Sequence, residues 1–554
     1  MRRAIITLLL SVTFLTGCIH NDLPYPVVVP NITSMTVQDA VKVDIDYETH
    51  VVTVYVSETT DLRNVVIQSV DFDIDFTRPS INLLGVHDLS SPLKFKLSTY
   101  QDYDWTIRAV RPVERYFTVE GQIGSSAIDE YNRRVIANVS EGTNISNLTV
   151  TSLKLGPKDI TTYSPAPEQM KNFIDGLEVE VTAFGQTEVW TIYVEETDIS
   201  VEIGKVNPWT TSAYVTAMAV AGRETVFHYR VKGAEEWTDV PASDVTSDGG
   251  TFTAHIMGLQ PSSDYEVMVS SGDDKTPVKE FTTAPDTKIP NGSFEYASLV
   301  SGTNYYKFYD PSCGVEEGEF MFWGSGNGEG SEGVNGSANM GIIITVLDKD
   351  SKVDGKQSVC AQTSQMAGIL AAGNLFTGQF AGLVGTEGGM VNFGRPWTTR
   401  PLAIKLHCRY TTSNIDIIGK KMPPGVTLTK ADNDRAQIKV ALGTWDYRTY
   451  GGSKDSPVHI NTTDASTFVD FSKDPCTIAN GDLIIHKDGY ILNGASLVDA
   501  STWEWAEYTI PLNYRDLETL PTHIIVSCAA SQYGDYFTGC SSSKLWIDAV
   551  ELIY

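Results

Sequence analysis

The sequence predicts an all-β protein, with tandem β-sandwich domains followed by one large C-terminal β-sandwich domain. Short segments that alternate apolar and polar residues between turn signals run along the whole chain, as in half-buried strands. A pattern of strands repeats after about 83 to 85 residues in the N-terminal part, and the last ~265 residues show almost no helical periodicity.

The N-terminus resembles a bacterial lipoprotein signal, which would occupy residues 1–18. Arg2 and Arg3 precede a short apolar run that ends in "LTGC", with Cys18 as its last residue. Such a run is too short to form a stable membrane helix, and a small-residue site follows it. We therefore expect export, lipidation of Cys18 and membrane attachment through the lipid. The expected location is the outer membrane, on the cell surface or on the periplasmic face.

A Pro-rich spacer at 19–30, "IHNDLPYPVVVP", would hold the folded part away from this anchor. The rest of the chain, about 530 residues, is expected to form three to five domains at about 100–200 residues each. Lys and Arg number 41 and Asp and Glu 69, which gives a net charge of −28 without any basic block. This balance argues against nucleic acid or an anionic lipid surface as a partner.

Two copies of one pattern predict two Ig-like domains, at 31–120 and 121–204. The stretch "VSE" that begins at Val56 recurs at Val139, and "WTIRAV" from Trp105 recurs as "WTIYVE" from Trp190. A repeat of this length with alternating strands fits a small β-sandwich better than a solenoid unit.

The segment 205–285 resembles a fibronectin type III domain. The resemblance rests on "LQPSSDYEVMVSSG", in which a corner leads into an alternating strand whose tyrosine packs at the edge of the sandwich. The matching residues are Leu259, Pro261, Tyr265, Val267 and Val269.

A linker with Pro285 and Pro290 leads to the last domain, at 291–554. Its strands, such as "LAIKLHCRY", "AQIKVALGTW" and "HIIVSCAAS", predict one large antiparallel sandwich with long loops.

Five motifs of this domain resemble, in order, the family called putative carbohydrate metabolism domain, found in Bacteroidetes lipoproteins. They are "NGSFE" from Asn291, "FWGSGN" from Phe322, "AAGNLFTGQF" from Ala371, "FGRPWTTRPLAIKLHCRY" from Phe393 and "SQYGDYFTGCSSSKLWIDAVELIY" from Ser531. The resemblance covers about half of the chain. It implies a jelly roll similar to carbohydrate-binding modules and a role with glycans.

The same resemblance implies a structural Ca²⁺ where the first and last strands of the jelly roll meet. Glu295 in "NGSFE" and Asp548 in "WIDAV" match positions that help to hold this ion in such modules. Carboxylate oxygens suit Ca²⁺, although six or more ligands are needed. A surface position for Glu295 and a turn-capping role for Asp548 are the alternatives.

The glycine-rich stretch "FMFWGSGNGEG" from Phe320 to Gly330 suggests a phosphate-binding loop at first sight. Such a loop opens a helix and usually adds a lysine. Here more glycines follow, no helix is predicted, and no lysine occurs between Lys307 and Lys349. We therefore expect no nucleotide, and interpret the glycines as loop formers.

Recognition of a poly- or oligosaccharide requires an aromatic platform with a few placed polar groups. Residues of this kind cluster in several segments, where a position in the core is the alternative for each tryptophan. The candidates are Trp323 with Asn327, Trp397 with Arg395 and Arg400, Trp445 with Tyr447, and the loop residues Tyr533 and Tyr536.

Glycoside hydrolysis would require two carboxyl groups about 5–9.5 Å apart. No pair of acids lies in a recognisable catalytic motif, and neither a GxSxG elbow nor HExxH is found. The available acids are Asp310, Glu316, Glu317, Glu319, Asp446 and Asp535.

The cysteines of the last domain leave their pairing open, since six allow fifteen connectivities and no zinc pattern is present. A short disulfide between Cys528 and Cys540 and two unpaired core thiols are both compatible with the spacing. The remaining cysteines are Cys313, Cys360, Cys408 and Cys476.

These observations predict a membrane-anchored lipoprotein whose last domain binds a glycan without cleaving it, by aromatic stacking and hydrogen bonds. A glycoside hydrolase that uses two acids of the same domain is the first alternative. A structural or adhesive surface protein is the second.

Overall fold

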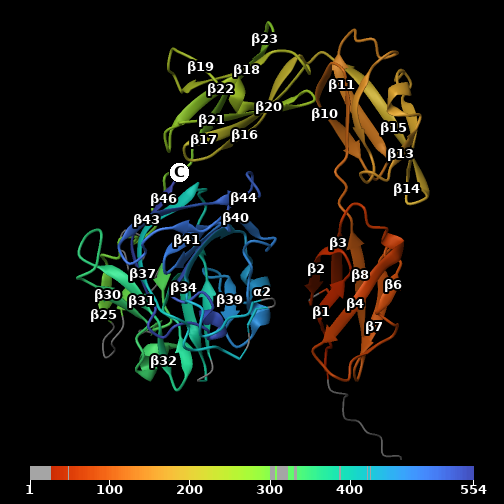
Figure 1. The fold of residues 1–554 in the computed structure, drawn as a ribbon. Helices are drawn as coiled ribbons and strands as arrows, with labels where there is room; N and C mark the ends of the chain where they lie inside the picture. The colour runs from red at the N-terminus through yellow and green to blue at the C-terminus, as the bar shows by residue number, and fades with distance from the viewer. Residues whose placement is uncertain are drawn as a thin grey trace, which may run out of the picture.

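The computed structural model describes residues 27–47, 49–299, 306–308, 322–329, 334–385, 388–420, 422–423 and 426–554. Cys18 and Cys313 lie outside this part of the chain. The described residues form strands almost throughout, which confirms the predicted all-β class. Figure 1 shows an arch, in which the first module and the large C-terminal domain form the two limbs. No helix in the described segments is long and apolar enough to cross a bilayer.

The first module is a sandwich of two sheets, with strand orders β1-β4-β6 and β2-β3-β8-β7-β5. Apolar residues at alternate positions of both sheets form its core. Its strands are β1 (Ile32–Val37), β2 (Ala40–Asp46), β3 (Val51–Val56), β4 (Val65–Phe72), β5 (Arg78–Pro79), β6 (Gly85–His87), β7 (Leu93–Ser98) and β8 (Asp102–Val110).

The second module has the sheet orders β10-β11-β15-β14-β13 and β12-β9. Its strands are β9 (Tyr116–Val119), β10 (Gln122–Asp129), β11 (Arg134–Ser140), β12 (Val150–Lys154), β13 (Thr162–Ser164), β14 (Leu177–Ala183) and β15 (Gln186–Thr197).

The sequence repeat corresponds to a repeated pair of parallel strands in these two modules. β3 pairs in parallel with β8, and β11 pairs in parallel with β15. Trp105 on β8 and Trp190 on β15 are both 1% exposed, each in the core of its own module. The repeated "WTI" therefore marks the same central strand in both sandwiches.

The third module has the sheet orders β16-β17-β21-β20 and β19-β18-β22-β23, with β24 paired to β22. At its predicted corner, the amide of Gln260 donates a hydrogen bond to the Tyr265 hydroxyl (2.9 Å), and Tyr265 is buried. The strands are β16 (Val201–Pro208), β17 (Ser212–Ala219), β18 (Thr225–Val231), β19 (Thr238–Asp239), β20 (Val245–Asp248), β21 (Thr251–Met257), β22 (Asp264–Ser271), β23 (Asp274–Lys275) and β24 (Lys279–Thr282).

In the C-terminal domain, a large sheet packs on a second sheet with the order β30-β31-β46-β37-β43. The second sheet contains β30 (Thr345–Asp348), β31 (Ser358–Gln362), β37 (Ala403–Thr411), β43 (Ala506–Pro511) and β46 (Lys544–Ile553). The central strands of the large sheet are β34 (Asn374–Val384), β45 (His523–Ala529), β38 (Ala436–Gly443) and β40 (Thr477–His486).

Shorter elements extend or flank the large sheet. They are β25 (Ala297–Leu299), β26 (Tyr306–Phe308), β27 (Trp323–Gly324), β28 (Gly328–Glu329), β29 (Val334–Asn335), β32 (Ser364–Met366), β33 (Ile369–Ala371), β35 (Gly388–Phe393), β36 (Arg395–Pro396), α2 (Tyr447–Tyr450), β39 (Val458–Asn461), β41 (Gly489–Leu492), β42 (Val498–Asp499) and β44 (Asn513–Tyr514). The 3₁₀ turns among the described residues are η1 (Leu62–Asn64), η2 (Pro167–Gln169), η3 (Ala242–Asp244), η5 (Ser337–Met340), η6 (Ala465–Thr467) and η7 (Gly534–Tyr536).

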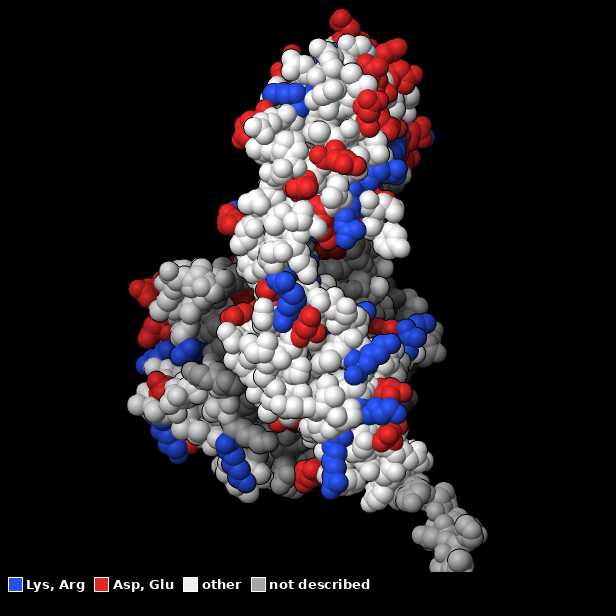
Figure 2. Space-filling model, turned by 90° about the vertical axis from the view of Figure 1, so that its right-hand side faces the viewer, with Lys and Arg blue, Asp and Glu red and all other residues white. Residues whose placement is uncertain are grey.

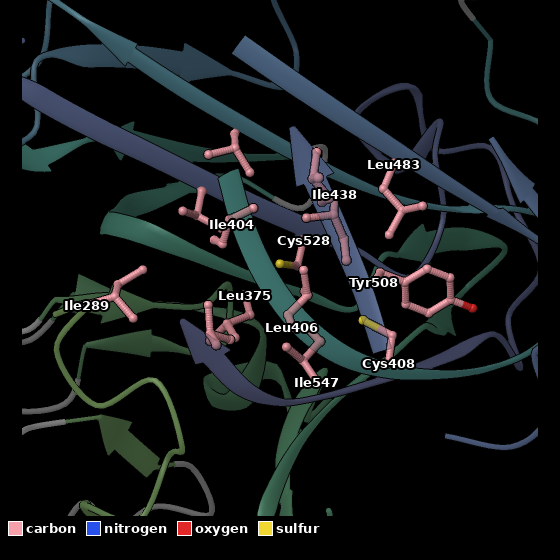
Figure 3. Close-up of a cluster of buried hydrophobic side chains, with 14 of the residues drawn as sticks. Ile289, Leu375, Ile404, Leu406, Cys408, Ile438, Leu483, Tyr508, Cys528 and Ile547 are labelled. Atoms are coloured by element: carbon pink, nitrogen blue, oxygen red, sulfur yellow. The ribbon is translucent and has the colours of Figure 1, made fainter. Parts of the chain in front are cut away.

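The core between the large sheet and the second sheet of the C-terminal domain contains Ile438, Leu483 and Ile547 among other aliphatic side chains (Figure 3). Cys408 and Cys528 lie in the same core, and burial raises the pKa of the Cys528 thiol to about 12. Neither is in a disulfide, and the described cysteines are all free. Of the two alternatives for Cys528 and Cys540, the structure therefore has the two unpaired buried thiols. The described cysteines are Cys360, Cys408, Cys476, Cys528 and Cys540.

Consecutive modules contact one another along the arch. Lys154 of the second module pairs with Glu58 of the first (2.9 Å). Ile123 on β10 forms a β-bridge with Val220, so the second module meets the third through backbone contact. On the face shown in Figure 2, acidic side chains gather at the upper end, whereas Lys and Arg are dispersed.

Arg400 joins the third module to the C-terminal domain. Its guanidinium donates to the Asn207 side chain (2.8 Å) and to the Leu517 carbonyl oxygen (2.6 Å), and lies 4.4 Å from the ring centre of Trp209. Trp209 also packs edge-on against Tyr514 of the C-terminal domain. Arg400, which the sequence suggests as a sugar ligand beside Trp397, is therefore a residue of the interdomain contact, where it is 4% exposed.

Candidate functional site

A cleft of about 1200 Å³ lies on the outer face of the large sheet, opposite the core between the sheets. Strand alternation explains its position, because Ile438 and Leu442 on β38 point into the core while Gln437 and Lys439 line the cleft. Apolar side chains of β34 and β35, including Phe380 and Phe393, and the segment at 468–471 form the walls.

The floor of the cleft is a row of side chains from four neighbouring strands. Phe376 of β34 pairs with Ser527 of β45, Ser527 pairs with Lys439 of β38, and Lys439 pairs with Asp482 of β40. Gln437 donates a hydrogen bond from its side-chain amide to the Asp482 carboxylate (2.8 Å). Register therefore brings together an aromatic ring, a hydroxyl, an ammonium and a carboxylate.

The turn η7, which follows β45, forms one wall of the cleft. Tyr533, Asp535 and Tyr536 all line the cavity. The Tyr536 ring packs edge-on against Phe468, with 5.1 Å between the ring centres. An aromatic wall thus stands beside the polar floor.

Two carboxyl groups of the cleft are shifted toward their protonated form. Burial raises the pKa of Asp482, and hydrogen bonding from Gln437 and the charge of Lys439 offset this in part. The cavity walls remove part of the water around the Asp535 carboxyl, which raises its pKa, although the residue keeps exposed surface. The charge of Lys439 opposes this shift too. Among the residues that the structure describes, Lys439 forms no salt bridge, so it acts on both acids through space.

Most of the sequence-predicted sugar ligands are packed inside the domain. Trp323, Asn327, Arg395, Trp397 and Trp445 are each no more than 5% exposed, which leaves a sugar ring no face to stack on. The structure thus gives these residues packing roles, the alternative that the sequence left open for the tryptophans.

Hydrogen bonds account for four of these buried side chains. The Trp323 indole donates to the Pro290 carbonyl oxygen (2.8 Å), and the Trp445 indole donates to Asp474 (3.0 Å). The Asn327 side chain donates to the Thr345 carbonyl oxygen. The Arg395 guanidinium donates to the carbonyl oxygens of Phe322 and Gly378 and to the Ser456 hydroxyl.

Three predicted ligands keep accessible surface, and two of them reach the cleft. Tyr533 and Tyr536 line it, as the sequence predicts for aromatic residues of a loop. Tyr447 is 43% exposed at the start of α2 and does not line the cleft.

Of the acids that the sequence offers for hydrolysis, one lies in the cleft and one lies outside it. Asp446 caps α2 and pairs with Arg448, whereas Asp535 lies in the cleft. The other four acids, Asp310, Glu316, Glu317 and Glu319, lie outside the described residues.

Sequence reasoning missed the polar floor, although a signal was present. "AQIKVALG" and "TIANGDLIIH" carry Gln437, Lys439, Asn480 and Asp482 at alternate positions, so each strand has one apolar and one polar face. These strands look like ordinary half-exposed strands until the fold shows that their polar faces are concave.

The glycines of "FWGSGNG" permit close packing around Trp323. A Cβ on Gly324 would lie 2.7 Å from the Gly378 carbonyl oxygen, and one on Gly326 would lie 2.8 Å from Ile344. Gly328 has a φ of 107°, which other residues rarely adopt. Gly330 lies outside the described residues.

The two predicted Ca²⁺ ligands converge on one loop. Glu295 accepts a hydrogen bond from the Lys356 amide (2.8 Å), and Asp548 accepts one from the Val353 amide (2.7 Å). No group of three acidic, histidine or cysteine side chains that could hold a metal occurs in the described segments. A Ca²⁺ ion here would therefore need further oxygen ligands from carbonyl groups or water.

Fold and cleft define a multidomain β-sandwich protein whose largest domain carries a cleft with aromatic walls and a polar floor. Residues 293–553 match the family described as putative carbohydrate metabolism domain. The C-terminal region is thus a carbohydrate-related domain of this family. A search of curated proteins finds no match.

Solved structures similar to this chain include two crystal structures described as putative glycoside hydrolases. The one from Bacteroides thetaiotaomicron VPI-5482 has 17% identity and a TM-score of 0.28, and the match covers 78% of this chain and 92% of that one. The one from Bacteroides vulgatus ATCC 8482 has 19% identity and a TM-score of 0.29, with 48% and 97% covered.

Proposed function

We propose that the C-terminal domain binds a glycan in the cleft on the outer face of the large sheet. The observation that carries this proposal is the combination of an aromatic wall at Tyr533 and Tyr536 with a polar floor at Gln437, Lys439 and Asp482. Aromatic faces accept the C–H side of a sugar ring, and planar amide and carboxylate groups accept its hydroxyls.

The charges of the cleft favour a neutral glycan. The charged residues that line it are Lys439, Asp470, Asp482 and Asp535, so acids exceed bases by two. Lys473 pairs with Asp470 (2.9 Å), but a uronate or sulfate group would still approach two carboxyl groups at close range. A neutral sugar can instead donate hydroxyl hydrogen bonds to both carboxylates.

A glycan array probed with residues 27–554 tests this proposal. Tyr536→Ala should weaken binding of the best glycan about tenfold, which corresponds to about 1.4 kcal/mol. Tyr447→Ala is the matched control, because it removes an exposed tyrosine of the same domain outside the cleft. The proposal fails if no glycan binds, or if Tyr447→Ala weakens binding and Tyr536→Ala does not.

Hydrolysis is the second candidate function, and the raised pKa values of Asp482 and Asp535 favour it. A carboxyl with a raised pKa holds its proton more tightly and can pass it to a glycosidic oxygen, while a second carboxylate activates water. A reducing-sugar assay on the bound glycan tests it. Asp482→Asn and Asp535→Asn should each abolish turnover, and absence of turnover in the wild type leaves binding as the function.

We further propose that Cys18 carries a lipid that tethers the chain to the outer membrane, on its surface or its periplasmic face. The basic, apolar and small residues before Cys18 support this. Metabolic labelling with a palmitate analogue should label the wild-type chain but not Cys18→Ala, and equal labelling of both would refute the anchor.

A further inference from the structure

Asp434 is a buried carboxylate behind the η7 wall of the cleft. It lies two residues before β38 and is 3% exposed. Its Oδ2 atom accepts hydrogen bonds from the Ser531 hydroxyl (2.6 Å), the Ser543 hydroxyl (2.8 Å) and the Cys540 amide (2.8 Å). One oxygen atom thus holds both ends of the loop at 531–543.

Further contacts fix the ends of this loop to the two sheets. The Ser531 hydroxyl also bonds to Thr363 (3.0 Å), and Ser543 bonds to Thr412 (2.8 Å). The Gln532 amide donates to the Arg435 carbonyl oxygen (2.7 Å), next to Asp434 in the chain. The anchor of the loop is therefore a connected network of buried polar groups.

The loop between these anchors packs closely against its surroundings and contains one backbone conformation that is rarely adopted. A Cβ on Gly534 would lie 2.4 Å from Ala372, and one on Gly539 would lie 2.7 Å from Ser531 and 2.9 Å from Asp434. Phe537 has a φ of 55°, the left-handed conformation that non-glycine residues seldom adopt. Such a conformation persists when surrounding contacts determine it.

We propose that Asp434 is a positioning residue of the cleft, which preorganises the loop that presents Tyr533, Asp535 and Tyr536 to the ligand. The inference rests on the proposed glycan-binding function. Ordering a loop or a side chain on binding costs conformational free energy, so a wall that is already held in place strengthens affinity. A buried carboxylate that accepts three hydrogen bonds at one oxygen can hold the loop at two points in a way that no apolar side chain could.

The test compares Asp434→Asn with Asp548→Asn in residues 27–554. Both positions are buried aspartates of the same domain that accept backbone amides, but Asp548 serves the loop at 353–357 rather than the cleft. Asparagine keeps one carbonyl oxygen for these donors but loses the negative charge that strengthens all three hydrogen bonds. Its NH₂ group would then face the Arg435 amide, which donates to the other carboxylate oxygen (2.8 Å), so the loop at 531–543 should loosen.

Two readouts separate positioning from general stability. Amide hydrogen exchange at 534–538 should become at least about tenfold faster in Asp434→Asn and stay unchanged in Asp548→Asn. Affinity for a panel of dextran, mannan, xylan and β-glucan should fall about tenfold in Asp434→Asn alone. If Asp434→Asn does not fold, Ser531→Ala, which removes one donor, should show both effects in weaker form.

Unchanged exchange and unchanged affinity in a folded Asp434→Asn or Ser531→Ala variant would overturn the inference. So would equal losses in Asp548→Asn, since they would reflect stability alone. If the wild type binds no polysaccharide, the proposed function fails, while the exchange comparison still decides whether Asp434 holds the loop.

Discussion

Replacing Trp323 by Phe separates a packing role from a ligand role at the residue that the sequence places first among the sugar ligands. Trp323 is 1% exposed, and its ring lies 5.4 Å from that of Phe294 and 5.7 Å from that of Phe322. Its indole nitrogen donates to the Pro290 carbonyl oxygen. Phenylalanine removes that donor and leaves a small cavity.

The expected cost follows from these contacts. Removing a whole buried aromatic side chain costs about 3–5 kcal/mol, and the smaller cavity of Trp323→Phe accounts for roughly 1–2 kcal/mol. An unpaired carbonyl oxygen at Pro290 adds about 1–2 kcal/mol. A total of roughly 2–4 kcal/mol lowers the Tm of a domain of this size by about 4–16 °C.

Calorimetry on residues 27–554 measures this shift, with wild type and variant scanned in parallel. One transition should move, and glycan affinity at 20 °C below that transition should remain that of the wild type. An unchanged Tm together with lost affinity would refute the reasoning, because it would mean that the ring faces a ligand.

Three further outcomes follow from the same structure. If Ca²⁺ binds between Glu295 and Asp548, EDTA lowers the Tm of the wild type but not that of Glu295→Gln, and equal curves with and without EDTA contradict the metal. Burial raises the pKa of Asp482 above its value in the unfolded chain, so this group's contribution to stability is full in acid and is lost as pH rises through the folded pKa. The urea midpoint of Asp482→Asn relative to wild type should therefore increase from pH 4 to pH 7, and a flat difference would count against the shift. Arg400→Met removes the hydrogen bonds to Asn207 and Leu517 and should increase the radius of gyration in X-ray scattering without changing glycan affinity, whereas an unchanged radius would show that the other contacts suffice.

The sequence is sufficient to predict the β architecture, because strand alternation is a local signal. Trp105 and Trp190 lie on equivalent strands, and the short motif "WTI" that marks both strands is itself a local signal. The Tyr265 corner is local as well, with its partner Gln260 five residues away.

The site could be predicted only in part, because it depends on contacts between distant residues. Lys439 and Asp482 become neighbours through strand register, although 43 residues separate them in the chain. Trp323 and Tyr536 both lie within a few residues of glycines, yet only the packing of the sheets places Trp323 in the core and Tyr536 on the cleft wall. Loop position was the more useful guide, since it singled out Tyr533 and Tyr536, and both line the cleft.

The central claim is that a glycan occupies the cleft on the outer face of the large sheet. A crystal structure with the best glycan from the array tests it most directly. The account predicts a sugar ring against Tyr536 with hydroxyls bonded to Asp482. A glycan bound elsewhere on the domain, with the cleft empty, would contradict it.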